Sequence, residues 1–241
     1  SALKVMGYQE VLIEKVVVEE KSGLEADART ARYGALDAVA QAFGASQIFL
    51  GHTRDDQAET VLLGLARGSG AKSIAGMPTL SPDGKYLRPL LGITRKETVA
   101  YCEDVGLDYW SDPQNLDTKF SRVKVRLNVL PVLEKELGPG IAEALSKTAG
   151  ILQEDLEYLD AQAAKAFKAV AKTTNNSVVL DVNGLEKLSA AIRNRVILKS
   201  LALLGTEPAK VQIDSINALV TNWHGQKPLA LPSVRVVRQG K

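Results

Sequence analysis

The order of apolar segments along the first quarter of the chain restricts the fold most strongly. Residues 10–19 are rich in β-branched side chains and predict a buried strand. Residues 24–43 show the three-to-four spacing of a helix, and Gly44 is a suitable stop for it. A short strand at 47–50 and a second helix from about 55 to 65 follow. Alternating strands and helices predict a parallel sheet with flanking helices, an α/β fold.

The rest of the chain is predicted to be mainly helical. Thr94 and Glu97 form a capping-box pattern that starts a helix running to Gly106. A further helix spans about 120–138, with Pro131 as a break or new start. Beyond it we expect a long helical segment at 139–170, a short strand at 177–182, helices at 190–204 and 211–223, and a small β element at 228–239. The expected domains are therefore 1–138, which contains the sheet, and a smaller, mainly helical domain at 139–241.

Composition excludes several classes of protein. The 241 residues are 45% apolar and 24% charged, as in ordinary globular domains. Cys102 is the single cysteine, so the chain forms no internal disulfide and no four-cysteine zinc site. The lone cysteine fits a reducing cytoplasm, where we expect the protein to be located. No apolar run reaches the roughly 18 residues of a membrane span, so we expect no membrane partner. The net charge of +2 leaves RNA binding to a local basic patch.

Residues 51–60 read GHTRDDQAET and lie where a short strand is followed by a helix. Open α/β sheets bind ligands outside the carboxyl ends of their strands, so the location suits a site. Asp56 and Glu59 share one helical face, where two carboxylates can receive an ammonium group or a magnesium ion. The structural alternative is that Asp55 or Asp56 caps the helix and Glu59 is an ordinary first-turn acid. His52 taken alone is more often a core or loop histidine.

Basic and aromatic residues give a second set of candidates. Four cations lie within eight residues: Lys119, Arg122, Lys124 and Arg126. Arg122 and Arg126 would face the same way on a helix, where they can clamp phosphates or a carboxylate, or simply face solvent. Arg29, Arg32 and Arg67 are further candidates, each more often a surface residue when taken singly. Tyr33 and the pair Tyr109–Trp110 can stack on a base, although such aromatics more often belong to a core.

The run at 51–60 resembles the GHxxDDQxET signature of the tRNA(Ile)-lysidine synthetases, which are N-type, or PP-loop, ATP pyrophosphatases. Other motifs of that family follow in the same order between residue 25 and about residue 133. They are Glu25, Ala28-Arg29 and Arg32-Tyr33, then 65–70, Gly76-Met77, Arg88-Pro89-Leu90-Leu91, and the loop at 112–117. A fainter likeness continues through Trp223-His224-Gly225-Gln226. Each motif is short, and their ordered combination is specific.

The chain departs from the family pattern in two places. The SGGxDS loop, which cradles the ATP phosphates in the family, does not occur in this sequence. We therefore expect residues 1–138 to be a partial catalytic domain that lacks the N-terminal PP-loop segment. The RNRIRH-type run of the family is altered at 122–127, where Arg122 and Arg126 match and Lys124 keeps only the charge.

The resemblance implies a fold of the PP-loop, or adenine nucleotide alpha hydrolase-like, type and a carbon–nitrogen ligase activity. The expected reaction joins free lysine to C2 of the wobble cytidine of tRNA(Ile) with a CAU anticodon, through an adenylated tRNA intermediate. ATP and Mg²⁺ are the expected cofactors. Domain 139–241 would bind tRNA and substrate. The resemblance assigns residues as follows: catalytic, Asp56, Glu59, Arg122 and Arg126; nucleotide-binding, His52 and Arg32; RNA-binding, Arg29, Arg67, Lys119 and Lys124.

Two alternatives stay open from the sequence. One is another PP-loop tRNA-modifying enzyme, such as a tRNA thiolase. Those enzymes usually need catalytic cysteines, and Cys102 belongs to no CxxC pair. The other is a non-catalytic RNA-binding fragment. The sequence does not fix the oligomeric state, and a homodimer is one option.

Overall fold

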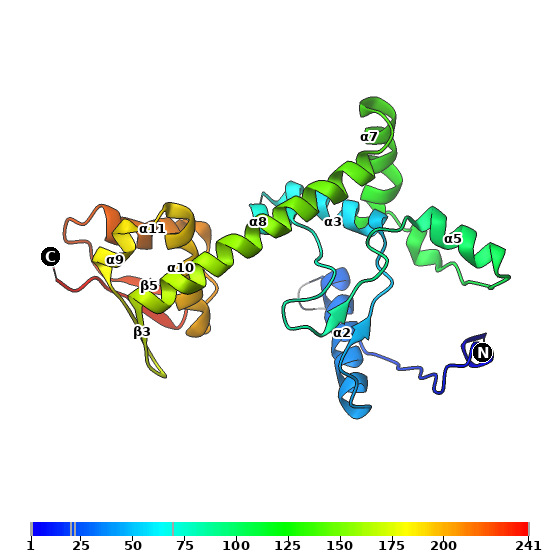
Figure 1. The fold of residues 1–241 in the computed structure, drawn as a ribbon, viewed down its shortest axis with the longest axis horizontal. Helices are drawn as coiled ribbons and strands as arrows, with labels where there is room; N and C mark the ends of the chain where they lie inside the picture. Colours follow the sequence, from blue (N-terminus) through cyan, green and yellow to red (C-terminus); the bar gives the residue numbers. More distant parts are fainter. Residues whose placement is uncertain (1, 20, 22, 69, 241) are drawn as a thin grey trace. The chain divides into compact units, whose positions relative to one another are not determined.

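A computed structural model describes residues 2–19, 21, 23–68 and 70–240. The chain divides into two compact units, Ser1–Gln153 and Glu154–Lys241. The division falls within α8 (Ile141–Val170), which Figure 1 shows as one long continuous helix. The domain boundary predicted at 138/139 precedes this helix. Within the described residues, no helix is both long enough and apolar enough to cross a membrane.

The first unit contains a short parallel sheet. Strand β1 (Ile48–Phe49) pairs with β2 (Tyr86–Leu87) in parallel, which confirms the predicted α/β class. Its helices are α1 (Ala2–Val5), α2 (Leu24–Ala42), α3 (Arg54–Arg67), α4 (Ala71–Ile74), α5 (Arg95–Asp104), α6 (Ser121–Lys124) and α7 (Leu130–Leu137), with a 3-10 turn, η1 (Pro113–Leu116), and a π-helical segment, η2 (Val125–Val129). Helix α5 begins with the predicted capping box, in which Thr94 and Glu97 satisfy each other's backbone N–H groups.

The strand predicted at residues 10–19 is wrong. This segment has no regular secondary structure, and its side chains are largely exposed, with Ile13 at 94%. β-Branched residues favour a strand only where a neighbouring strand accepts its hydrogen bonds and covers its side chains. No strand of the described residues lies beside this segment, because β1 pairs with β2.

The predicted helix at 120–138 is present, and its middle turn is widened. α6, η2 and α7 follow one another without a break. Pro131 has no N–H to donate to the carbonyl four residues earlier, and its ring crowds that carbonyl. The π-helical segment η2, which ends two residues before Pro131, accommodates this mismatch. The same turn carries Arg126.

The second unit is mainly helical, as predicted. It contains the end of α8, the hairpin of β3 (Ala171–Thr173) and β4 (Val178–Leu180), helices α9 (Val182–Lys187), α10 (Ala190–Leu203) and α11 (Lys210–Thr221), and the hairpin of β5 (Leu229–Leu231) and β6 (Val234–Val236). Two neighbouring residues of α10 belong to different apolar clusters. Val196 packs in the cluster of Phe167, and Ile197 packs in the cluster of Ile213.

Arg238, two residues after β6, is hydrogen-bonded to the end of α11. Its Nη1 donates to the carbonyls of Leu219 and Val220 at 2.7 and 3.1 Å, which satisfies part of the helix end. Its guanidinium lies 5.2 Å from the centre of the Trp223 ring. Trp223, the first residue of the Trp-His-Gly-Gln motif, thus has a packing role in the second unit.

Candidate active site

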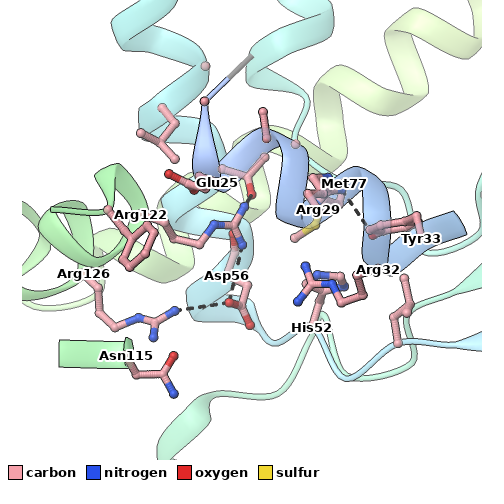
Figure 2. A pocket seen from close by; sticks show the side chains of 18 of the residues that line it. Glu25, Arg29, Arg32, Tyr33, His52, Asp56, Met77, Asn115, Arg122 and Arg126 are labelled. Atoms are coloured by element: carbon pink, nitrogen blue, oxygen red, sulfur yellow. Dashed lines mark hydrogen bonds and ion pairs between the residues drawn. The ribbon is translucent and has the colours of Figure 1, made fainter. Parts of the chain in front are cut away.

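A cavity of about 1380 Å³ lies in the first unit (Figure 2). Its walls come from α2, the turn after β1, α3, α4, the start of α5, and the segment from Asn115 to Arg126. The position beyond the carboxyl end of β1 is where open α/β sheets bind their ligands.

Asp56 combines the capping role and the site role that the sequence left open. Its Oδ2 accepts hydrogen bonds from the backbone N and Oγ1 of Thr53, at 2.9 and 2.8 Å, and so closes the start of α3. Its Oδ1 points to a group of arginines. Burial would raise the pKa of Asp56, but the Thr53 hydrogen bonds and the positive charges of Arg95 and Arg122 together lower the pKa below its usual value. The carboxylate therefore stays ionised at neutral pH.

Glu59 lies one turn further along α3 and is completely buried. Arg126 holds it through both oxygens, with Nε 2.6 Å from Oε1 and Nη2 3.1 Å from Oε2. Burial raises the pKa of Glu59 above its usual value, against the opposing hydrogen bonds and charge of Arg126. Glu59 does not line the cavity, whereas Arg126 does.

Three guanidinium groups surround Asp56, and we call Arg95, Arg122 and Arg126 the arginine cluster. Their closest nitrogens lie 3.6, 3.7 and 3.4 Å from Oδ1 of Asp56. Figure 2 shows Arg122 and Arg126 pointing toward Asp56. Arg122 also donates to Oγ1 of Thr60 at 3.1 Å. The sequence indicated two members of this cluster and missed Arg95.

Arg95 reaches the cavity because the starts of α3 and α5 meet. The backbone N of Arg95 donates to Oδ2 of Asp55 at 2.7 Å, and the backbone N of Arg54 donates to the carbonyl of Ile93 at 2.8 Å. Asp55 thus satisfies one of the free N–H groups at the start of α5. The capping box at Thr94 gives the start of that helix in the sequence, but the pairing with Asp55, forty residues away, is a tertiary contact.

His52 lines the same cavity and is partly buried. Burial lowers the pKa of His52 to about 4, and the positive charges of Arg88 and Arg122 act in the same direction. Its buried Nδ1 has no hydrogen-bond partner among the described residues. The neutral ring therefore has an open position for a ligand atom.

Other cations make the cavity strongly positive. Eight arginines and lysines line it, against three acids, an excess of five positive charges: Arg29, Arg32, Arg67, Lys72, Arg95, Lys119, Arg122 and Arg126, and Glu25, Asp56 and Asp117. Arg29 lies 4.7 Å over the Tyr33 ring and donates to its hydroxyl at 3.2 Å. Lys124 is exposed and does not line the cavity. Such a surplus suits a polyanionic ligand.

Gln57, the third residue of the Asp-Asp-Gln run, has a structural role. Its side chain exchanges two hydrogen bonds with the backbone of Met77, at 2.7 and 2.9 Å. Gly76 leaves room for it, since a Cβ there would lie 2.6 Å from Oε1 of Gln57. The Gln57 motif and the Gly76-Met77 motif therefore contact each other, and this contact fixes the cavity wall beside α3.

The aromatic candidates divide into two groups. Tyr33 is partly buried and packs edge-to-face on Tyr86 at 4.9 Å between ring centres. Tyr109 and Trp110 are exposed, Trp110 at 79%, so the core interpretation is wrong for this pair.

The described residues contain no group of three or more histidine, cysteine or acidic side chains that could hold a metal ion.

Comparison with known proteins shows first which domain families the chain contains. Residues 5–133 match the family model of the PP-loop domain, and residues 180–240 match that of the TilS substrate binding domain. The chain is 50% identical to the tRNA(Ile)-lysidine synthase of Leifsonia xyli subsp. xyli over 98% of its own length and 71% of that protein. It is 44% identical to the corresponding protein of Thermobifida fusca, over 97% and 71% of the two chains. The chain belongs to the tRNA(Ile)-lysidine synthase family.

A more distant likeness links it to a solved structure of a U34-tRNA thiolase from Methanococcus maripaludis. The TM-score is 0.46 and the identity is 22%, over 57% of this chain and 47% of that one. The curated relatives favour the lysidine synthase interpretation over the thiolase alternative.

Proposed function

We propose that the protein ligates free lysine to C2 of the wobble cytidine of tRNA(Ile), using ATP. The observation that carries the proposal is the arginine cluster around Asp56, in a strongly positive cavity of a chain from this family. An amino acid with two charged ends and a polyanionic RNA both match such a surface.

The chemistry divides into two steps. The C2 carbonyl oxygen of cytidine attacks the α-phosphorus of ATP, an O–P bond forms, and pyrophosphate leaves. The ε-amine of lysine then attacks C2, a C–N bond forms, and the C2–O bond breaks as AMP leaves. The attacking amine must be neutral, so its proton has to pass to a base. The adenylated oxygen leaves readily, whereas the unmodified oxygen would not.

Asp56 is assigned to the amine end of lysine. Its carboxylate is ionised and faces the cavity, so it can hold an ammonium group by charge. Its lowered pKa makes it a weak base, which suits a brief acceptance of the proton better than a lasting one. Glu59 is a positioning residue in this assignment, because it is buried behind Arg126 and orients that guanidinium. Arg122 and Arg126 are assigned to the same lysine-binding part of the cavity.

Other residues that line the cavity are assigned to the nucleotide and the RNA. His52 and Arg32 are the proposed nucleotide contacts, and the neutral Nδ1 of His52 suits a hydrogen bond to a base or sugar. Arg29, Arg67 and Lys119 line the cavity and are proposed phosphate contacts, with Lys124 as an exposed addition. Mg²⁺ is expected to accompany ATP through its phosphates. No step is assigned to the metal, since the described residues offer no cluster of metal-binding side chains.

The second unit is proposed to help bind the tRNA, consistent with its match to a substrate-binding domain. The thiolase alternative is disfavoured by the cysteine content. Cys102 is partly buried on α5 and does not line the cavity. A thiolase would need a sulfur-carrying group there.

Radiolabelled lysine tests the proposed function. The full-length protein is incubated with ATP, Mg²⁺, labelled lysine and a tRNA transcript with a CAU anticodon. We expect label to enter the tRNA only with ATP, and a transcript with uridine at the wobble position to remain unlabelled. ATP-independent labelling, or no labelling of the CAU transcript, would overturn the proposal.

A further inference from the structure

Arg95 differs from the other two members of the arginine cluster in how little its guanidinium is engaged. Arg126 is held by Glu59 and Arg122 donates to Thr60. The guanidinium of Arg95 makes no hydrogen bond within the described part of the chain, and its one ion pair there is the 3.6 Å contact with Asp56. Its buried Nε has no partner there either. A charged fork of donors is thus left open at the cavity.

The side chain of Arg95 is also the most accessible of the three. It is 42% exposed, compared with 26% for Arg122 and 17% for Arg126. Its backbone is fixed at the start of α5 by the hydrogen bond to Asp55, so the root of the side chain is held in place. An anchored arginine with free donors suits a planar anion that arrives with a ligand.

Neighbouring Arg54 provides a contrast. It lies at the start of α3, and its guanidinium pairs with two surface acids, Glu97 and Glu143, both at 3.5 Å. Arg54 does not line the cavity, whereas Arg95 does. Pairing with surface acids therefore explains the presence of Arg54. Arg95 has no such pairing with surface acids among the described residues.

The cavity wall around Asp56 carries three guanidinium groups and one carboxylate, since Asp55 and Glu59 do not line the cavity. A second carboxylate would balance this surplus. We propose that Arg95 is a specificity-determining residue that binds the α-carboxylate of the amino-acid substrate, with Arg122 beside it. The proposal rests on the proposed function and adds what the enzyme recognises at the far end of lysine.

L-Lysinamide is the probe, because it replaces the α-carboxylate with a neutral amide of the same size. Ligation of lysine and of lysinamide is measured for the wild-type full-length protein, Arg95→Ala, Arg95→Lys and the matched control Arg54→Ala. Pyrophosphate release from ATP on tRNA, without any amino acid, is recorded for each protein. Thermal melts check folding, and Arg95→Gln gives the same comparison if Arg95→Ala does not fold.

We expect Arg95→Ala to lower kcat/KM for lysine roughly tenfold to a hundredfold more than it lowers kcat/KM for lysinamide. Arg95→Lys should recover part of the preference, as a point charge without the fork. Arg54→Ala should keep both the wild-type ratio of the two substrates and the wild-type rate of pyrophosphate release. An equal loss for both amines, or no loss for either, would overturn the role of Arg95. Failure of the wild type to ligate lysine at all would overturn the proposed function instead.

Discussion

Arg126 and Glu59 form a bidentate ion pair, with Nε 2.6 Å from Oε1 and Nη2 3.1 Å from Oε2. Arg126 comes from the π-helical turn η2 and Glu59 from α3, so the pair joins two walls of the cavity. Because Glu59 is completely buried, its charge is compensated mainly by this arginine. The pair fixes where the guanidinium of Arg126 lies relative to Asp56.

Replacement of Glu59 by glutamine should abolish lysidine formation while the fold and tRNA binding remain. Glutamine keeps the shape and one acceptor, but it no longer holds both donors of Arg126 in place. Glu59→Ala should also unfold more easily, by roughly 3 kcal/mol, because it removes the bidentate partner of the partly buried Arg126 and leaves that guanidinium only its 3.4 Å contact with Asp56. Turnover, lysine saturation and thermal melts are the measurements.

Glu143→Gln is the matched control for this prediction. Glu143 pairs with Arg54 and Lys147 at the surface, and its side chain is 48% exposed. Unchanged turnover and lysine saturation in Glu59→Gln would mean that Glu59 is only a structural acid of α3.

Alanine at both Arg122 and Arg126 should weaken the apparent affinity for lysine roughly tenfold to a hundredfold, because charged hydrogen bonds to the substrate are lost. The salt dependence of tRNA binding should stay the same. Arg122→Ala is measured alone as well, since loss of Arg126 leaves the charge of Glu59 buried. A flatter salt dependence with normal lysine affinity would instead assign these arginines to RNA phosphates.

Arg29 and Arg67 are expected to contact RNA phosphates. Each alanine replacement should lower the slope of log K against log salt by roughly 0.7 to 0.9, the value for one lost phosphate contact. Filter binding at several salt concentrations measures the slope. Lys135→Ala, which removes an exposed lysine paired with its neighbour Glu136, should leave the slope unchanged. Equal slopes for all variants would remove Arg29 and Arg67 from the RNA surface.

His52 should remain neutral down to about pH 4. Its folded-state pKa lies below the ordinary value of 6.5, so folding favours the neutral ring. Its contribution to the free energy of unfolding is therefore present above pH 6.5 and is lost as the pH falls toward 4. Proton NMR follows its ring signal, and a His52→Gln variant identifies that signal among the two histidines. A midpoint near 6.5 would contradict the burial of this ring.

Trp110 should stack on an unpaired base of the tRNA. It is highly exposed, on the segment just before the cavity-lining residues Asn115 and Lys119. The sequence has two tryptophans, and Trp223→Phe removes the signal of the other one, so the fluorescence of Trp110 can be followed and should be quenched when tRNA binds. Trp110→Ala should weaken tRNA binding by about 1–3 kcal/mol. Unchanged fluorescence and unchanged affinity would remove Trp110 from the RNA surface.

The sequence predicted the parts of the site that local patterns determine. The Asp-Asp-Gln run after β1, the capping box at Thr94 and the helix that carries Arg122 and Arg126 are each encoded within a few residues. The motif also indicated Asp56 and Glu59 as site residues, but it did not show that one lines the cavity and the other is buried. Their difference depends on Arg126, sixty-seven residues beyond Glu59, which buries one carboxylate and leaves the other at the cavity.

Other features depended on tertiary contacts that no local pattern contains. Residues 10–19 have strand propensity, but without a strand beside them they remain irregular and exposed. Arg95 entered the cavity through a backbone contact with Asp55, and Trp110 proved exposed although apolar neighbours suggested a core.

Nucleoside mass spectrometry shows whether the wobble cytidine of the tRNA receives lysine. A CAU-anticodon tRNA treated with the full-length protein, ATP and lysine is digested to nucleosides, and the released AMP is measured in the same reaction. We expect the wobble cytidine to gain the mass of one lysine less one water, with one AMP released for each modified nucleoside. An unmodified cytidine, or a sulfur-containing product without lysine, would contradict this expectation.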